Sequence, residues 1–403
     1  MDKKQYFSFF MLLILLFTAK IIIGQVDDKL MNNCEDSLKY QIKIQISNNS
    51  YKKIRNSSGI KLSFSDFQLN NNGIDIPVKS LKIRGKTSLY YPKKSFTLKL
   101  KKNLEIDGMQ DTVLAKDCYL LSLTMDQNYI VNYSAYSLLK FLNIFNLTFN
   151  YCEVVINDET QGIYLIMERP HDYTFETLKS PVLIRRGFNG EIDEMELNDK
   201  VYQGKPKYFR KMFTHLYSLC NKYSGETLYD SLNNYIDLDQ YMKWLAFNYL
   251  VRDGDYTDEV FFYYDSSKKR FEIIPWDYDD LFVNYPHEGK EARRAVQGGK
   301  YIFSSEDRID RAIIGDEFLY KKYFEQLSYL SEQLNDKVLF DIFQKTYCSV
   351  YPYYLDSNII KTTEFDKYGL TNIDELYVNI QKKLNILRAM RDMVKQQLNT
   401  NPQ

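Results

Sequence analysis

Residues 249–282 constrain the fold most, because they contain a β-hairpin whose open end is acidic. The apolar run Val260–Tyr264 predicts one strand, Asp265–Arg270 predicts the turn, and Phe271–Pro275 predicts the returning strand. Acidic residues lie just before the first strand and just after the second, namely Asp253, Asp255, Asp258, Glu259, Asp277, Asp279 and Asp280. Because antiparallel pairing brings these two ends side by side, the two acidic clusters should face each other.

Two interpretations of these clusters stand side by side. Carboxylates that gather in one place repel each other, so their pKa values rise unless a cation joins them. A hard divalent ion such as Mg²⁺, which prefers oxygen ligands, would relieve that repulsion. Alternatively, acidic residues flank strands because loops are solvated and Asp favours turns. Asp277 favours a functional site, because it lies between Trp276 and Tyr278 at the end of an apolar strand.

Composition excludes several classes of protein. The 403 residues carry 53 Lys and Arg against 53 Asp and Glu, so no global field would attract nucleic acid or an acidic membrane. The 35 Tyr and 25 Phe accompany many Asn, Lys and Ile, which indicates a coding bias rather than a sugar-binding surface. Five scattered Cys and three scattered His argue against a disulfide framework, a zinc site and a Ser or Cys hydrolase triad. One or two disulfides stay open.

The N-terminus predicts export. Residues 1–24 read as a cleavable signal peptide, with Lys3 and Lys4 before the apolar run Tyr6–Ala19, which is too short to span a bilayer comfortably. An uncleaved anchor that adds Ile21–Ile23 is the alternative. Residues 25–38 form a leader, and no later segment is apolar enough to cross a membrane. We therefore expect a secreted, cell-surface or periplasmic protein without a membrane span after cleavage.

The remaining chain predicts one mixed α+β domain, with strands first and helices last. The expected strands are Lys39–Ile46, Leu81–Ile83, Ser95–Lys101, Tyr151–Asn157, Gly162–Met167 and Val182–Arg186. The expected helices are 126–145, 208–223, 237–251, 318–334, 336–351 and 373–398. Residues 187–204 are polar and predict a loop. Asp126 and Asp237 are expected to cap two of the helices, and Gly254 to end the helix 237–251.

Two adjacent lysines precede the strand Ser95–Lys101. Its alternation places Lys94 on the same face as Phe96, so the ammonium group approaches the interior and requires an anion. Lys93 should then face water. The alternative is that both lysines lie in the preceding turn and have no role.

Four sequence blocks carry a resemblance to a known family. They are Ile83-Arg84-Gly85, Tyr91-Pro92-Lys93-Lys94-Ser95-Phe96, Gly162-Ile163-Tyr164-Leu165-Ile166-Met167-Glu168 and Ile274-Pro275-Trp276-Asp277-Tyr278-Asp279. Their order resembles the CotH family of atypical secreted protein kinases, the spore coat protein H-like proteins, over roughly residues 39–351. The resemblance implies an atypical protein-kinase-like fold over residues 39–400. A β-rich N-terminal lobe, about residues 39–170, and a largely helical C-terminal lobe, about residues 171–400, would hold ATP and Mg²⁺ or Mn²⁺ between them.

The resemblance also implies a role for individual residues, with a secreted or surface protein as the substrate. Asp253 matches the catalytic aspartate and Asp277 the metal-binding aspartate. Glu259 and Asp279 are further expected metal ligands. The expected nucleotide-binding residues are Arg84, Lys94 (with Lys93 as the alternative) and Glu168, the ion-pair partner of the lysine. A positioned carboxylate and basic residues around the phosphates are what phosphoryl transfer needs.

One departure from the family leaves three functions open. Asp258 or Glu259 stands where the family usually has an Asn, and alignment does not decide which. An added negative charge beside ATP is compatible with an active kinase, or with a kinase-fold surface or structural interaction protein that has lost most of its transfer activity. A glycan-active enzyme that uses two carboxylates is a third possibility. It would leave Lys94 and the Asp277 metal site without a purpose.

Overall fold

The computed structural model describes residues 34, 39–71, 73–107, 112–287, 299–364, 366–368 and 372–400. The predicted signal peptide (1–24) and, except for Cys34, the predicted leader (25–38) lie outside the described residues. Within them, no helix has both the length and the apolarity to cross a membrane.

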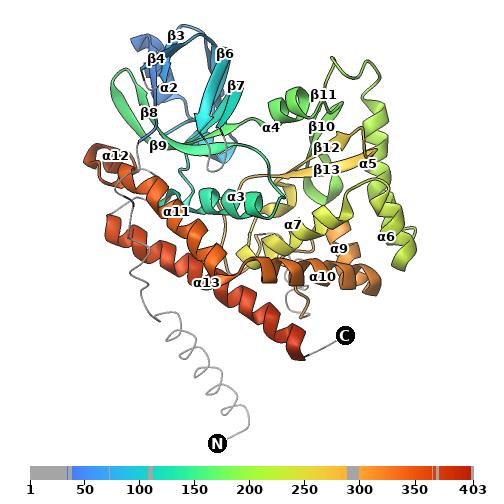
Figure 1. Ribbon diagram of the computed structural model, residues 1–403. Helices are drawn as coiled ribbons and strands as arrows, with labels where there is room; N and C mark the ends of the chain where they lie inside the picture. The colour runs from blue at the N-terminus through green and yellow to red at the C-terminus, as the bar shows by residue number, and fades with distance from the viewer. Residues whose placement is uncertain are drawn as a thin grey trace, which may run out of the picture.

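A nine-stranded sheet forms the first part of the described chain (Figure 1). Its strand order is β2-β5-β6-β7-β9-β8-β1-β3-β4, and every neighbouring pair is antiparallel except β1 and β8. The strands are β1 (Gln41–Ile46), β2 (Ser63–Phe64), β3 (Phe67–Asn71), β4 (Ile74–Ile76), β5 (Val78–Arg84), β6 (Ser95–Asp107), β7 (Thr112–Leu121), β8 (Phe149–Ile156) and β9 (Glu159–Glu168).

Alternation of apolar and polar residues explains strand β1, which lies between β8 and β3. In β1, Ile42, Ile44 and Ile46 are buried while the residues between them are exposed, as expected for a strand with one face on a core. In contrast, β8 and β9 are buried on both faces. Helices on the second face explain this burial, since β8 contacts α11 (Asp336–Tyr354) and β9 contacts α12 (Ser357–Lys361).

A four-stranded antiparallel sheet holds the acidic hairpin. Its order is β11-β10-β12-β13, with β10 (Val182–Arg186), β11 (Ile192–Leu197), β12 (Val260–Asp265) and β13 (Arg270–Pro275). The predicted hairpin is confirmed, because β12 and β13 pair with Val260 opposite Pro275. The predicted loop 187–204 is corrected by β11, an edge strand whose exposed side chains explain its polar sequence.

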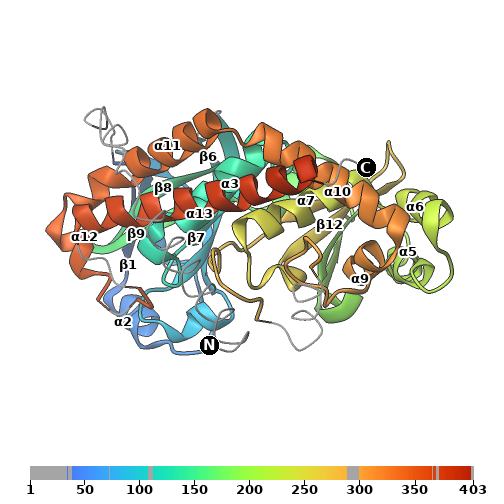
Figure 2. The same ribbon diagram turned by 90° about the horizontal axis from the view of Figure 1, so that it is seen from below.

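Helices fill the rest of the described chain. The long helix α13 crosses the underside of the molecule (Figure 2) and contacts α7, α10 and α11. The α-helices besides α11 and α12 are α2 (Asn48–Asn56), α3 (Val131–Phe141), α4 (Pro170–Asp172), α5 (Lys207–Leu219), α6 (Gly225–Asn233), α7 (Leu238–Val251), α9 (Arg308–Gly315), α10 (Glu317–Gln333) and α13 (Ile373–Thr400). Short non-α turns include η2 (Thr87–Tyr90), η3 (Gln127–Tyr129), η4 (Tyr173–Thr177), η5 (Phe188–Gly190) and η6 (Tyr256–Asp258).

The helix α7 begins and ends as predicted, but a different residue terminates it. The Asp237 carboxylate accepts a hydrogen bond from the Gln240 backbone N–H, which is the predicted cap. The helix ends at Arg252, and the left-handed residue that terminates it is Arg252 itself, with a φ of 52°, rather than Gly254. Gly254 serves a different purpose, because a Cβ there would lie 2.1 Å from Oδ2 of Asp280.

The helix α3 starts later than predicted, at Val131, because the turn η3 precedes it. Asp126 still caps this helix. Its two carboxylate oxygens accept hydrogen bonds from the backbone N–H groups of Val131 and Asn132, at 2.8 and 2.7 Å. Burial raises the pKa of Asp126 to about 7, although these hydrogen bonds act against the increase.

One disulfide joins Cys34, ahead of β1, to Cys348 in α11. The sequence left one or two bridges open, and this pairing spans 314 residues. Cys118, Cys152 and Cys220 are free thiols. The bridge therefore ties the first described residue to the helical half of the molecule.

Candidate functional site at the mouth of the hairpin

Asp277 sits at the centre of the candidate site, with a fixed backbone and an exposed side chain. Its φ of 53° lies in the left-handed region, which is uncommon for a residue with a side chain and recurs at functional sites. The Asp277 N–H donates to the Tyr136 hydroxyl at 3.1 Å, and the next N–H, of Tyr278, donates to Oδ1 of Asn132 at 2.9 Å. Helix α3 therefore holds the backbone that presents this carboxylate.

Two arginines from different sheets flank Asp277. Arg84 ends β5, and its guanidinium carbon lies 3.7 Å from the centre of the Tyr119 ring and 5.9 Å from that of Trp276. Arg185, in β10, places Nη2 2.5 Å from Oε2 of Glu259. Loss of hydration against the surrounding protein raises the pKa of the Asp277 carboxyl, and the charges of Arg185 and Arg84 act against that increase. The site thus combines a presented carboxylate with two guanidinium groups.

The acidic clusters converge as the hairpin predicted. Glu259 and Trp276 are adjacent across the hairpin, because the Trp276 N–H donates to the Glu259 carbonyl at 3.0 Å. Burial, and then the charge of Asp277, raises the pKa of the Glu259 carboxyl well above its usual value, while Arg185 opposes the increase. Burial followed by Asp277 has the same effect on Asp279. Mutual repulsion therefore favours any cation that can reach these groups.

The three expected metal ligands do not form a metal site in this conformation. In the described part of the chain, no group of three or more Asp, Glu, His or Cys side chains is placed to hold one ion. Glu259 instead bonds to Arg185, with only 13% of either side chain exposed. The metal-binding roles of Asp277, Glu259 and Asp279 stay predictions.

Asp253 lies directly after helix α7 and is buried. Its Oδ1 accepts from the Asp255 N–H at 3.1 Å, and its own N–H donates to the Asn248 carbonyl at 3.0 Å. Asp253 contributes to the raised pKa of Tyr278, after burial, so its carboxylate lies near the segment that follows β13. The sequence-predicted aspartates 253 and 277 are thus brought to the same region by α7 and the hairpin.

The loop after Asp253 is anchored by a buried arginine that the sequence analysis did not single out. Arg186 donates from Nε to the Thr257 carbonyl at 2.6 Å, and its Nη1 lies 3.5 Å from Oδ1 of Asp307. The preceding residue, Arg185, was also missed as a site residue. The sequence signal for Arg185 is the pair of arginines that ends the apolar strand Val182–Arg186. Because neighbouring residues of a strand point to opposite faces, the two arginines must lie on opposite faces of the sheet.

Both predicted lysines are buried, which corrects the expectation that Lys93 faces water. Lys94 donates to the carbonyl oxygens of Leu89 and Tyr91, at 2.7 and 2.6 Å. Burial lowers its pKa. Lys93 donates to the Ile163 carbonyl at 2.7 Å and to the Tyr129 hydroxyl at 3.0 Å. Lys94 therefore stabilises the turn before β6, and Lys93 ties the start of β6 to β9.

Glu168 ends β9 and is buried. Its Oε2 accepts from the Thr148 backbone N–H at 3.4 Å. Lys94, its expected partner, bonds to backbone carbonyls as described above. The nucleotide-binding roles of Glu168, Arg84 and Lys94 stay predictions.

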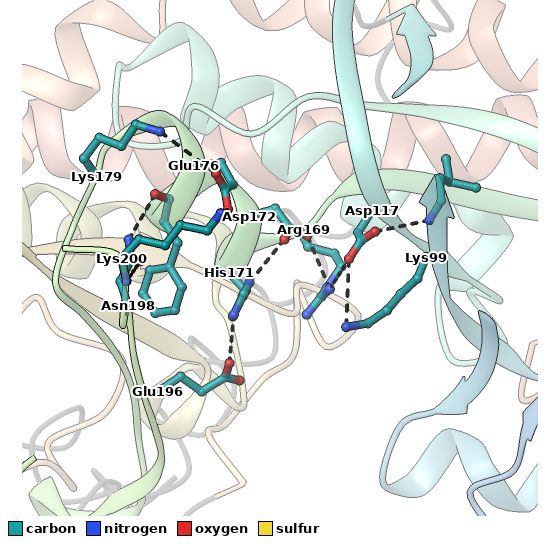
Figure 3. A network of polar contacts seen from close by, with 12 residues as sticks. Lys99, Asp117, Arg169, His171, Asp172, Glu176, Lys179, Glu196, Asn198 and Lys200 are labelled. Carbon is teal, nitrogen blue, oxygen red and sulfur yellow. Dashed lines mark hydrogen bonds and ion pairs between the residues drawn. The ribbon is translucent and has the colours of Figure 1, made fainter. Parts of the chain in front are cut away.

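A chain of ion pairs connects the two sheets beside the site (Figure 3). Arg169 follows β9, and its Nη1 lies 3.0 Å from Asp117 of β7 and 3.3 Å from Asp172 of α4. His171 continues the chain, with Nδ1 3.2 Å from Asp172 and Nε2 3.0 Å from Glu196 of β11. The network thus joins one strand of each sheet through the segment that links them.

This network predicts a pH-dependent stability. The hydrogen bonds to Asp172 and Glu196 raise the pKa of His171 to about 9. A folded-state pKa above the ordinary value means that this contribution is complete below about pH 6.5 and is lost as the pH rises through about 9. Because the ring is partly exposed, we expect His171→Gln to remove about 1 kcal/mol of unfolding free energy at about pH 6 and almost none at about pH 9.5.

Urea unfolding of both proteins at several pH values measures this difference. His215→Gln is the control, because it replaces a histidine whose ring packs edge-on against Tyr235 instead of bonding to two carboxylates. A wild-type and a His171→Gln profile that run parallel from acid to alkaline pH would contradict the prediction.

Comparison with known proteins identifies a family model and several similar structures. The family model described as CotH kinase protein matches residues 81–391. None of the curated proteins matches. The Helicobacter pylori proinflammatory kinase CtkA is 11% identical over 75% of this chain and 90% of that chain, with a TM-score of 0.28. HipA of Shewanella oneidensis MR-1, in complex with HipB and operator DNA, is 12% identical over 89% and 73%, with a TM-score of 0.32.

Proposed function

Because the chain belongs to the CotH kinase protein family, we propose that it is a secreted or surface-associated kinase that uses ATP. In this proposal it transfers the γ-phosphoryl group to hydroxyl groups of a secreted or surface protein. The observation that carries the proposal is the exposed Asp277 carboxylate, held at a positive φ between arginines from two different sheets. Two arginines that act on the same carboxylate suit the charge of a nucleotide polyphosphate.

The proposed roles follow from chemistry that these side chains can perform. A substrate oxygen bonds to the γ-phosphorus, the bond from that phosphorus to the bridging oxygen breaks, and ADP leaves. Asp253 accepts the hydroxyl proton, which is the usual task of a carboxylate in this reaction. Arg84 and Arg185 compensate the charge on the phosphate oxygens and orient the group for attack. Arg186 keeps the loop after Asp253 in place from inside the protein.

ATP with Mg²⁺ or Mn²⁺ is the cofactor set that the family implies. A divalent ion would neutralise phosphate charge. Since the expected carboxylate ligands do not form a three-ligand group here, no step above is assigned to the metal. The Cys34–Cys348 disulfide supports the proposed export, because such bridges persist in oxidising compartments.

A thermal-shift titration with ATP and Mg²⁺ or Mn²⁺ tests the nucleotide site. A ligand at a hundred times its dissociation constant stabilises the folded state by about 2.7 kcal/mol, so the midpoint should rise. We expect Asp277→Asn, which tolerates the positive φ better than Ala does, to lose most of that rise. Asp265→Asn, in the distal turn of the same hairpin, should keep it. Absence of any nucleotide-dependent rise in the wild-type protein would sink the proposal.

A second function is favoured by one specific observation. Arg185 occupies the Glu259 carboxylate, which the kinase hypothesis assigns to the metal. A kinase-fold surface or structural interaction protein with little transfer activity would have no need to release that pair. Labelled-phosphate transfer distinguishes the two functions, since only the kinase turns over.

A further inference from the structure

The ion pair between Arg185 and Glu259 is built into the pairing of strands. In β10, Arg185 lies opposite Phe261 of β12, two residues beyond Glu259. The Arg185 guanidinium lies 5.9 Å from the Phe261 ring centre, and its Nη2 lies 2.5 Å from the Glu259 carboxylate. Both side chains are only 13% exposed. The contact is therefore fixed by the sheet and largely removed from water.

The charges around Glu259 make this arginine the main source of compensation. Three carboxylates act on Glu259, those of Asp277, Asp258 and Asp255, and Arg185 is the cation that acts against them. Arg185 thus already occupies one of the three carboxylates expected to hold metal.

A guanidinium and a divalent ion make incompatible demands on Glu259. Arginine takes carboxylate oxygens through N–H donors, whereas Mg²⁺ and Mn²⁺ need the same oxygens as direct ligands. Two cations at one carboxylate also repel each other.

We propose that Arg185 is the resident counter-cation of Glu259, and that a divalent ion binds this carboxylate only when Arg185 leaves it. The inference deepens the proposed function, on which it rests, by naming a residue that regulates metal access to the same site. Arg185 then acts as a gate on metal binding in the resting protein. Once it is released, its guanidinium is free to turn to the phosphates.

Direct binding of Mn²⁺ alone, without nucleotide, tests this inference by counting free Mn²⁺ with electron paramagnetic resonance. A neighbouring opposite charge shifts the affinity of a carboxylate for a proton by about 10- to 1000-fold. We therefore expect Arg185→Gln to bind Mn²⁺ about tenfold or more tightly than the wild-type protein. Adding Glu259→Gln to that variant should abolish most of the gain.

The matched control is Arg270→Gln, at the opposite end of the hairpin. Arg270 pairs with Asp237 at the same 2.5 Å, so its removal breaks an equivalent contact away from the site. Its Mn²⁺ affinity should equal that of the wild-type protein. Arg185→Lys keeps a positive charge without the planar fork, and its affinity should fall between those of wild type and Arg185→Gln. This second variant also keeps the test valid where Arg185→Gln folds poorly.

The outcomes separate this inference from the proposed function. Unchanged or weaker Mn²⁺ binding in both Arg185 variants overturns the inference, even where the wild-type protein transfers phosphate. Tighter binding that depends on Glu259 supports it. That support holds even where no variant transfers phosphate, in which case the proposed kinase activity fails and the gate remains.

Discussion

Asp253→Asn should lower phosphoryl transfer by about 10²–10⁴-fold, the usual contribution of a positioned acid–base group. The asparagine is close in size and keeps an oxygen that can accept from the Asp255 N–H, so the fold of this buried loop should survive. It lacks the basicity to take a hydroxyl proton. The ATP-dependent rise in the unfolding midpoint should therefore remain while turnover is lost.

Transfer of labelled phosphate to a generic acceptor protein measures the turnover, and thermal shift measures binding in the same preparation. Asp265→Asn in the hairpin turn is the control, because the Asp265 carboxylate bonds locally to Ser267 and lies at the far end of β12. Turnover by Asp253→Asn within a few-fold of wild type would remove Asp253 from the role of base.

The hairpin was predictable from sequence because its signals are local. An apolar run, a polar turn and a second apolar run determine the antiparallel pairing of Val260 with Pro275. That pairing then brings Glu259 and Asp277 together without further information. The same reasoning yields Asp237 as a helix cap, since capping needs only a carboxylate three residues before its N–H donor.

The lysines show where a local pattern stops being informative. Period two was extended backward from Phe96 to Lys94 and Lys93, but the strand begins at Ser95 and a turn precedes it. Outside the strand, neighbouring side chains need not alternate. Lys93 is buried because its ammonium group finds the Ile163 carbonyl, 70 residues away, which no local pattern can reveal.

Arg185 was missed for a related reason. Its pairing with Glu259 follows from β10 lying beside β12, although 74 residues separate the two side chains. The sequence showed both the strand and the acidic cluster, but it did not show that these strands are neighbours. A metal site inferred from carboxylates alone therefore overlooked the cation already present.

Lys93→Met should cost about 3–5 kcal/mol of unfolding free energy, the usual effect of removing one partner from a buried charged cluster. Burial lowers the pKa of Lys93 to about 8, and the charge of Asp366 opposes that change, so the ammonium group is charged at neutral pH. Tyr129 links the two, because its hydroxyl contacts both the Lys93 ammonium group and the Asp366 carboxylate. Methionine fills the space of the lysine but leaves that carboxylate without its cation.

Urea unfolding of the single and double variants tests whether the loss arises from the cluster. Adding Asp366→Asn to Lys93→Met removes the stranded charge, so the double variant should recover much of the stability. Lys94→Met, which loses only bonds to the carbonyls of Leu89 and Tyr91, should cost about 1–3 kcal/mol. If Lys93→Met instead kept its stability and lost the ATP-dependent thermal shift, Lys93 would be a nucleotide contact, because a purely structural lysine cannot affect binding without affecting folding.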